Sequence, residues 1–352
     1  MHKLWSDAAK RTEPYVPGEQ LNDPDIIKLN TNESPYGPSP NVIEAIQKEV
    51  SHHLQLYPAP DAEALRDDIG RYYQLDKEHI FVGNGSDEVL AFSFMAFFNT
   101  DARIQFPSVT YSFYPVYAKL FHIPYEEVPL NQDFTIPVES FFQSDGGIIM
   151  ANPNAPTGIY LSLENVETIA ANNSDQVVIM DEAYIDFAPA SAASLVQDYP
   201  NLLIVQTMSK SRSLAGLRIG FAIGQPHLIE ALFRIKDSFN SYTMDRLALA
   251  GAAAAMKDDH YFQETTEEII RTREWLIPEM KKRGFSVLPS AANFIFTTHS
   301  TVKAETLYNE LKRRKILIRH FQNPAIANHV RITIGTEKQM EQLLRAIDAI
   351  IA

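Results

Sequence analysis

The chain has 352 residues, and 31 Lys and Arg stand against 44 Asp and Glu, which gives a formal net charge of −13. Such an acidic surface repels nucleic-acid phosphates and anionic lipid, so we expect neither as a partner. A small anionic substrate is not excluded, because a few local arginines can override the global field. The chain has no cysteine, which excludes disulfides, thiolate metal sites and a cysteine nucleophile, and no metal site is predicted.

The distribution of apolar residues predicts a soluble, cytoplasmic protein. Residues 1–5 lead into a polar stretch without the apolar centre of a signal peptide. The longest uncharged run, Val89 to Thr100, is too short to cross a bilayer. The absence of cysteine also fits the cytoplasm. The length suits one large domain with a smaller companion.

The first forty residues are rich in Pro, Asn and Gly and predict an extended arm that lies on another part of the protein. Helices are expected from Asn41 to Leu54 and from Asp61 to Tyr73. Short apolar strands then alternate with helices, which predicts a mostly parallel sheet with helices on both faces. The strands are expected at 80–82, 147–150, 177–180, 202–205 and 218–223, and the intervening helices at 86–98 and 163–171.

The last hundred residues have a different pattern. Long helical stretches follow Asp245 as far as about Arg283, and residues 285–352 then read strand, strand, helix, strand, strand, helix. The predicted fold class is therefore α/β, with a large parallel-sheet domain and a small α+β domain. We expect residues 1–45 to form the arm and the start of the small domain, 46–270 the large domain, and 271–352 the rest of the small domain.

Three predicted strand ends carry polar residues, and ligands of parallel α/β sheets bind outside the carboxyl ends of the strands. The first end is the turn Gly83 to Ser86, where glycines allow close approach and a helix start offers N–H groups to a phosphate. The second is Asp181, after a wholly apolar strand. Such an aspartate often only caps a turn, but a buried one can also pair with a protonated ring nitrogen.

The third strand end runs from Ser209 to Gly220 and contains Lys210 and Arg218. Most lysines are solvated surface charges. A lysine that follows a buried strand and lies near other cations has a lowered pKa, and it can then act as a Schiff-base amine and proton carrier. Arg218 and Ser209 could hold a phosphate dianion.

With these three motifs, the chain resembles the fold-type I pyridoxal-phosphate aminotransferases over nearly its whole length. Other matching stretches are Pro14 to Gly18, Leu29 to Pro38 and Leu56 to Pro58. The run from Leu214 to Gly220, after the lysine, is highly specific for this fold type. The N-terminal stretches point to the branch of the family that acts on histidinol phosphate.

The resemblance implies a role for each matching position. Lys210 would bind pyridoxal 5′-phosphate as a Schiff base and carry the proton, Asp181 would pair with the pyridine nitrogen, and Tyr184 would bond the ring O3′. Tyr111 would stack on the ring. The residues expected around the cofactor phosphate are Ser209, Arg218, Gly85, Ser86 and the backbone N–H of Asp87, whose carboxylate is expected to point elsewhere.

The resemblance also implies a substrate site and a homodimer with shared active sites. Arg331 and Arg319 are expected to bind the phosphate of L-histidinol phosphate and, in the second half-reaction, the carboxylates of 2-oxoglutarate. Arg319 could equally be a surface ion pair. Tyr57 is expected to reach the neighbouring subunit's cofactor phosphate, and it is placed with Asn32 among the substrate-binding residues.

One loop departs from the family pattern. The fold type usually reads Asn-Pro-Thr-Gly, with that asparagine on the cofactor's O3′, whereas here Ala155 stands at the asparagine position of the run Asn152 to Gly158. We expect Asn154, or else Asn152, to supply the contact, unless it is missing altogether.

Other functions compatible with these residues are an aromatic amino acid aminotransferase and a threonine-phosphate decarboxylase, which would keep the same cofactor residues. A transcription regulator built on this fold would need an additional basic DNA-binding domain, which the acidic chain does not offer. A scaffolding role would leave the strand-end Asp, Tyr, Lys and Arg unexplained.

Overall fold

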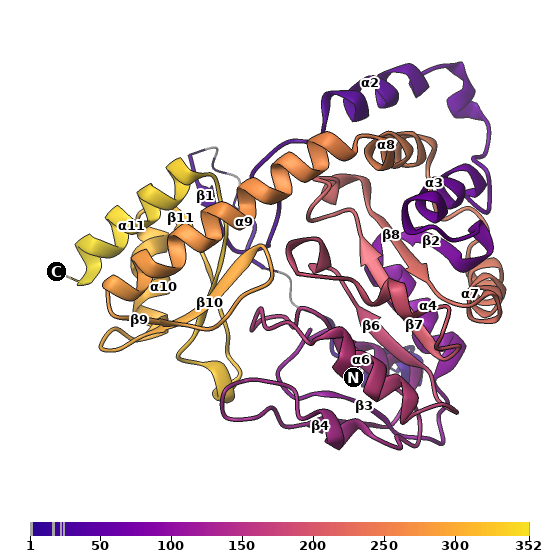
Figure 1. The fold of residues 1–352 in the computed structure, drawn as a ribbon, viewed down its shortest axis with the longest axis horizontal. Helices are drawn as coiled ribbons and strands as arrows, with labels where there is room; N and C mark the ends of the chain where they lie inside the picture. The colour runs from indigo at the N-terminus through magenta and orange to yellow at the C-terminus, as the bar shows by residue number, and fades with distance from the viewer. Residues whose placement is uncertain (1–2, 16–17, 22, 24, 352) are drawn as a thin grey trace.

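The large domain is built on a seven-stranded sheet with the order β2-β8-β7-β6-β5-β3-β4. The computed structural model describes residues 3–15, 18–21, 23 and 25–351 (Figure 1). Strand β8 runs antiparallel to both of its neighbours, and the other neighbouring strands run parallel, which confirms the mostly parallel sheet. The strands are β2 (Ile80–Asn84), β3 (Ile104–Pro107), β4 (Tyr125–Val128), β5 (Ile148–Ala151), β6 (Val178–Asp181), β7 (Leu202–Thr207) and β8 (Ile219–Ile223).

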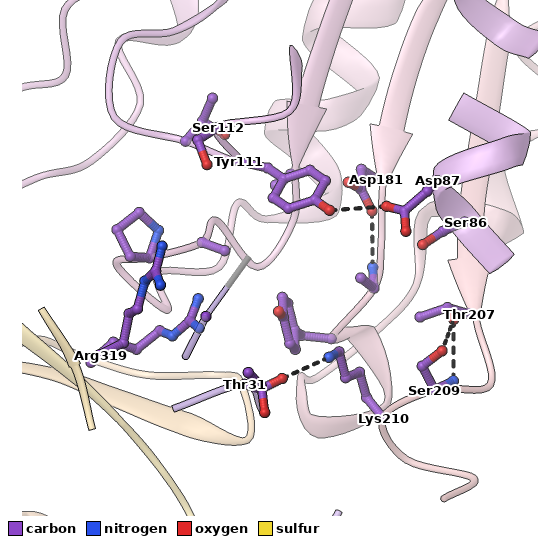
Figure 2. Close-up of a pocket in the computed structure, with 18 of the residues that line it drawn as sticks. Thr31, Ser86, Asp87, Tyr111, Ser112, Asp181, Thr207, Ser209, Lys210 and Arg319 are labelled. Atoms are coloured by element: carbon purple, nitrogen blue, oxygen red, sulfur yellow. Dashed lines mark hydrogen bonds between the residues drawn. The ribbon is translucent and has the colours of Figure 1, made fainter. Parts of the chain in front are cut away.

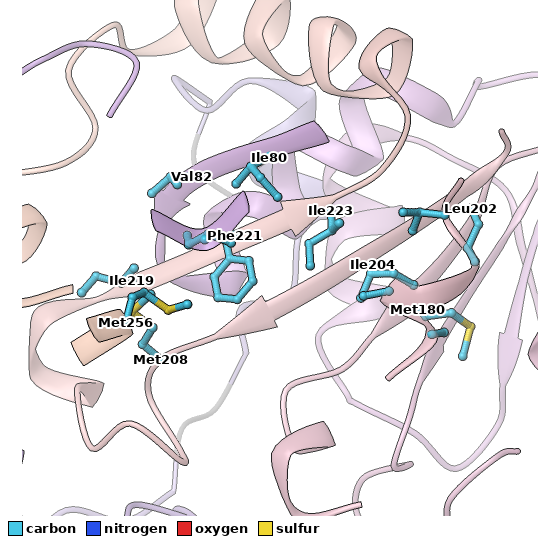
Figure 3. Close-up of a cluster of buried hydrophobic side chains, with 14 of the residues drawn as sticks. Ile80, Val82, Met180, Leu202, Ile204, Met208, Ile219, Phe221, Ile223 and Met256 are labelled. Atoms are coloured by element: carbon cyan, nitrogen blue, oxygen red, sulfur yellow. The ribbon is translucent and has the colours of Figure 1, made fainter. Parts of the chain in front are cut away.

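Helices cover both faces of the sheet because the central strands are apolar on both faces until their carboxyl ends. Successive side chains of a strand point to opposite faces. Ile204 and Phe221 therefore lie in one buried cluster (Figure 3), whereas Leu203 and Ala222 lie in another on the opposite face. Helices α2 (Pro40–Glu49), α3 (Glu63–Tyr73), α6 (Leu163–Ala171) and α8 (Arg246–Lys257) contribute to the first cluster, and α4 (Gly85–Phe97), α5 (Tyr114–Phe121) and α7 (Pro226–Phe239) to the second.

Several elements differ from the sequence-based expectation. The helix expected from Asn41 to Leu54 ends earlier, at Glu49, and Ser51 then caps a short 3₁₀ helix. Strands β3 and β4 and helices α5 and α7 were not predicted. Strand β4 lies at the sheet edge and carries two exposed glutamates, so it lacks the apolar run that marked the central strands.

The small domain is a four-stranded antiparallel sheet, β12-β13-β10-β9, packed against three helices. Its first helix, α9, runs from the large domain to the small one (Figure 1). The elements are α9 (Asp259–Lys282), β9 (Phe285–Val287), β10 (Phe294–His299), α10 (Ala304–Arg313), β12 (Arg319–His320), β13 (Val330–Thr333) and α11 (Glu337–Ile351). The division expected between residues 270 and 271 falls inside the continuous helix α9 and stays a prediction.

The N-terminal arm lies across both domains. Its helix α1 (Asp7–Arg11) is bonded to the large domain, since the guanidinium of Arg11 donates to two carbonyls at the end of α5. Its strand β1 (Ile27–Lys28) pairs in parallel with β11 (Ile316–Leu317) of the small domain. Val16 and Pro17 of the N-terminal motif lie outside the described residues. In the described part of the chain, no helix is long and apolar enough to cross a membrane.

Candidate active site

One pocket collects most of the predicted site residues at the carboxyl ends of β6 and β7 and the start of α4 (Figure 2). Its walls come from the large domain, the arm and the small domain. They are formed by Tyr15, Gly18, Asn30, Thr31, Ser86, Asp87, Thr110, Tyr111, Ser112, Ala151, Ala155, Pro156, Asp181, Ala183, Tyr184, Thr207, Ser209, Lys210, Arg218, Arg319, Phe321 and Arg331.

Asp181 is the last residue of β6, and its carboxylate is buried. The hydroxyl of Tyr114 donates to Oδ2 at 2.9 Å, and the N–H of Ala183 donates to Oδ1 at 3.3 Å. Burial raises the pKa of Asp181 to about 6, although both hydrogen bonds favour the ionised form. The carboxylate is therefore held in place in a poorly solvated wall, where a cationic partner would interact strongly with it.

Lys210 follows β7, and its side chain is hydrogen-bonded to the N-terminal arm. Its Nζ donates to the carbonyl of Thr31 at 3.1 Å (Figure 2). Burial, and next to it the charge of Arg331, lower the pKa of Lys210 to about 8, against the opposing effect of Glu33 and Asp87. Near neutral pH, a far larger fraction of this amine is unprotonated than for an ordinary lysine, so it can act as a nucleophile and base.

The start of α4 and the loop between β7 and β8 form an anion-binding corner. Gly85 has a φ of +79°, which favours glycine, and a Cβ placed there would lie 2.5 Å from Nη2 of Arg218. Ser86, Ser209 and Arg218 line the same corner, and the Ser209 hydroxyl accepts a hydrogen bond from Thr207 at 2.9 Å. A helix N-terminus, hydroxyls and a guanidinium are the groups that bind phosphate.

The carboxylate of Asp87 lies inside this corner, so the prediction that it points elsewhere is wrong. Its Oδ2 pairs with Nη2 of Arg218 at 2.9 Å. Its Oδ1 accepts a hydrogen bond from the Tyr111 hydroxyl at 2.9 Å, which Figure 2 shows. The arginine and the phenol both attract the carboxylate, which outweighs its repulsion from a site built for anions. Tyr111 lines the pocket as expected for an aromatic wall.

The asparagines of the loop before α6 do not reach the pocket. The amide of Asn154 donates to the carbonyl of Val109 and to Thr157, and its oxygen accepts from Thr110. The amide of Asn152 bonds both backbone groups of Leu161. These bonds satisfy backbone groups of Val109, in the loop after β3, and of Leu161, just before α6. The expectation that Asn154 or Asn152 supplies the missing contact is therefore wrong for this structure, and Ala155 presents only a methyl group.

Two arginines of the small domain form the opposite wall. Arg319 on β12 and Arg331 on β13 are directly paired across the antiparallel ladder. Like charges at such positions repel each other, and neither has a carboxylate partner among the residues described. Arg331 donates to the carbonyl of Asn30 at 3.1 Å, its buried Nε has no partner in that same set, and burial lowers its pKa. This wall therefore carries positive charge that no carboxylate of the described residues neutralises, and an anion can bind to it.

Tyr57 and Asn32 do not line the pocket. Tyr57 is 77% exposed and stacks on Tyr242 with 4.5 Å between ring centroids. Asn32 is buried behind Tyr184 and bonds its hydroxyl. The expected substrate contact of Asn32 is thus not seen, since its amide is turned to a protein partner. The prediction for Tyr57 concerns a second subunit and stays a prediction.

Sequence reasoning missed the residues that support the predicted ones. Tyr114, the partner of Asp181, stands in the same aromatic run as Tyr111, and that run was the available signal. Asn30 and Thr31, which meet Arg331 and Lys210, directly precede the predicted Asn32. Within the described ranges, no group of three or more His, Asp or Glu could hold a metal ion.

Comparison with known proteins shows the family to which the chain belongs. The pattern of the family described as aminotransferase class I and II matches residues 24–347. Histidinol-phosphate aminotransferase 1 of Oceanobacillus iheyensis is 60% identical over 351 residues, covering 100% of this chain and 99% of that protein. The histidinol-phosphate aminotransferase of Clostridium acetobutylicum is 53% identical, with both chains fully covered. The crystal structure of the Sinorhizobium meliloti histidinol-phosphate aminotransferase with pyridoxal 5′-phosphate has a TM-score of 0.90 at 23% identity, covering 100% of this chain and 98% of that one.

Proposed function

Because this chain belongs to the aminotransferase class I and II family, we propose that it transfers the amino group of L-histidinol phosphate to 2-oxoglutarate. The products are imidazole-acetol phosphate and glutamate, and the step belongs to histidine biosynthesis. Relatives that are 60% and 53% identical over the full chain are named for the same amino donor. A cytoplasmic location is part of the proposal, and cell fractionation would test it.

The observation that carries the proposal is that one pocket joins a partly buried lysine to a pair of arginines that have no carboxylate partner among the described residues. Lys210 has a pKa of about 8 and faces the wall that holds Arg319 and Arg331. A nucleophilic amine alone would suit many reactions. An amine opposite a strong anion site suits a substrate that carries its reacting group at one end and a phosphate or carboxylate at the other.

The cofactor is pyridoxal 5′-phosphate, and the residues present fit it. We propose that Lys210 binds its carbonyl carbon, that Asp181 pairs with its ring nitrogen, and that the corner around Gly85 and Arg218 holds its phosphate. The close approach of the Arg218 guanidinium to Gly85 at the start of α4 supports the phosphate assignment. The buried, hydrogen-bonded carboxylate of Asp181 supports the pairing with the ring nitrogen. Once bound, the cofactor supplies an electron sink that weakens the C–H bond beside the substrate amino group.

The proton is moved by the chain itself. In the first half-reaction the unprotonated Nζ of Lys210 takes the proton from the amino-bearing carbon of the donor. In the second half-reaction the same nitrogen returns a proton to the corresponding carbon of the acceptor. The lowered pKa of Lys210 keeps the amine close to the operating pH, which is the condition for efficient transfer in both directions.

The two substrates are proposed to use the arginine wall in turn. A planar guanidinium binds phosphate and carboxylate equally well by two parallel hydrogen bonds. Because the donor product leaves before the acceptor enters, Arg331 and Arg319 can hold the phosphate of the first substrate and a carboxylate of 2-oxoglutarate afterwards.

A half-reaction tests the proposal directly. The cofactor-loaded protein is mixed with histidinol phosphate alone while its visible absorbance is followed, and 2-oxoglutarate is then added. We expect the cofactor band to disappear and to return. A response to aromatic amino acids only would make the enzyme an aromatic aminotransferase, and release of carbon dioxide from threonine phosphate would make it a decarboxylase. No band after addition of cofactor would remove Lys210 from the centre of the site.

We further propose a homodimer in which Tyr57 completes the partner's site. Its ring stacks on the exposed Tyr242, and the exposed Leu54 and Leu56 line the same surface hollow as Tyr57. Contiguous apolar surface of this kind is typical of a protein interface. Sedimentation should give a dimer mass. A hybrid of a Lys210→Ala subunit with a Tyr57→Ala subunit should regain one intact site, whereas shared sites are excluded if mixing restores no activity.

A further inference from the structure

Asn32 is buried between three parts of the protein, and all its polar groups are bonded. It has a left-handed φ of 57° and is 1% exposed. Its Nδ2 donates to the hydroxyl oxygen of Tyr184 at 2.9 Å, and its carbonyl accepts from Asn293 at 3.0 Å. Thr333 of β13 accepts from its backbone N–H and donates to its Oδ1, both at 3.0 Å. The arm, the small domain and the large domain thus meet at this side chain.

The orientation of the Asn32 amide follows from these bonds. The Thr333 oxygen accepts the N–H of Asn32, so the Thr333 proton is free to point at Oδ1 of the amide. In the structure Oδ1 faces this threonine, and the amide NH₂ faces the Tyr184 oxygen. An amide NH₂ can only donate, so the Tyr184 oxygen is the acceptor in this bond.

The Tyr184 proton must therefore point in another direction. The ring packs beside Ala155, Ala292 and Phe294, which offer no acceptor side chain. In the part of the chain that the structure describes, Asn32 is the one hydrogen-bond partner of this hydroxyl. Since Tyr184 lines the pocket, the open direction for its proton is the pocket itself.

We propose that Asn32 is a positioning residue, which turns the Tyr184 proton toward the cofactor's ring oxygen, and that it does not bind substrate. The inference rests on the proposed function, because it assigns Tyr184 to the cofactor. The alanine at position 155 makes this orientation more important. Ala155 cannot donate a hydrogen bond to the ring oxygen, so the Tyr184 hydroxyl is left as the donor from this wall. Thr333 lies on the strand of Arg331, so Asn32 also ties that strand to the cofactor wall.

The test is the pH at which the visible band of the bound cofactor changes, measured without substrate. A hydrogen bond donated to the ring oxygen stabilises its anionic, high-pH form, so loss of the bond moves the midpoint to higher pH. Asn32→Gly keeps the left-handed backbone and removes only the amide. We expect an upward shift of about 0.5–1 pH unit and a ~5-fold fall in kcat, as for the loss of one hydrogen bond, with an unchanged KM for histidinol phosphate.

A double-mutant cycle separates positioning from direct contact. In a Tyr184→Phe background, Asn32→Gly should cause no further shift, because the group that it orients is gone. A KM increase that persists in that background would overturn the proposal in favour of substrate contact. An unchanged midpoint in the Asn32→Gly single variant would overturn it as well. Gln74→Gly is the matched control, since Gln74 also carries a carboxamide at φ 57° but is exposed and far from the pocket.

Asn32→Asp guards against misfolding of the glycine variant. It keeps the size and backbone preference of asparagine and can accept but not donate, so Tyr184 would turn its proton toward the new carboxylate. The part of its midpoint shift that disappears in the Tyr184→Phe background measures the hydrogen bond, and a shift that is the same in both backgrounds would overturn the proposal. These titrations need no substrate, so their outcome does not depend on which amino donor the protein uses. Failure of the half-reaction would count against the proposed function, whereas failure of the titrations would count only against the role of Asn32.

Discussion

The two walls of the pocket differ in how their charges are balanced. On the large-domain wall, Asp181 has donors from its own domain and Arg218 has a carboxylate beside it. On the small-domain wall, Arg319 and Arg331 face each other without a carboxylate among the described residues. One wall is thus organised before any ligand arrives, as electrostatic catalysis requires. The other keeps its charge available for substrate.

The walls are joined at a few named points of the arm. Lys210 bonds Thr31, Tyr184 bonds Asn32, and Arg331 bonds Asn30. Three consecutive arm residues therefore set the distance between the reacting groups and the anion site. Substitutions on the large-domain wall should accordingly change the rate of chemistry, whereas those on the small-domain wall should change substrate affinity.

The largest effect is expected for Lys210→Ala. Removing both the nucleophile and the proton carrier should lower turnover by at least about 10⁴-fold, and the visible band of the bound cofactor should disappear. Steady-state kinetics with histidinol phosphate and an absorbance spectrum measure the two effects. Retained turnover would show that Lys210 is neither the nucleophile nor the proton carrier.

The next effect is expected for Asp181→Asn. Replacing the buried carboxylate by a neutral amide removes the partner of the cofactor's ring nitrogen, so kcat should fall about 10²–10³-fold with little change in KM. Glu182→Gln is the matched control, because this neighbouring buried carboxylate bonds Ser191, Ala192 and Gln206 away from the pocket. It should lower the free energy of unfolding by about 1–3 kcal/mol and leave kcat near the wild-type value.

Arg331→Ala should act on affinity instead. Loss of hydrogen bonds to a charged group corresponds to a rise of about 10–100-fold in the KM for 2-oxoglutarate, with a smaller change in kcat. Arg345→Ala removes an exposed arginine whose partner is Glu341 and serves as control. Initial rates at varied 2-oxoglutarate give both parameters, and an unchanged KM would remove Arg331 from the site.

The smallest effect concerns pH. The neutral form of Lys210 is the nucleophile, and its fraction rises with pH until the pH exceeds the pKa of about 8. The rate at which cofactor-free protein captures pyridoxal 5′-phosphate should therefore increase about tenfold between pH 7 and pH 9 and then level off. Stopped-flow absorbance measures it. A rise that continues toward pH 10.5 would show that the lysine keeps its ordinary pKa.

The large-domain wall could be predicted from sequence because its signals are local. Asp181 and Lys210 each follow an apolar run of strand residues, 178–180 and 202–205, and the strand ends of a parallel sheet converge. The direction of the Asp87 side chain could not be predicted, because Tyr111 and Arg218 determine it from 24 and 131 residues away. Asn154 was wrongly predicted for a related reason: the pattern shows that an amide is present, not that the carbonyl of Val109, 45 residues away, accepts a hydrogen bond from it.

The loop between β7 and β8 bears on how the protein folds. The two strands are adjacent and antiparallel, with Thr207 opposite Gly220, so Lys210 and Arg218 lie in one short hairpin connection. The arm, in contrast, bonds Thr333 across 301 residues of chain. Short loops close at low entropic cost and long ones at higher cost. A folding chain should therefore form the hairpin that holds Lys210 early. The wall that holds Arg319 and Arg331 is complete only when the arm docks, which should be a late step. Substrate preference would then be acquired last.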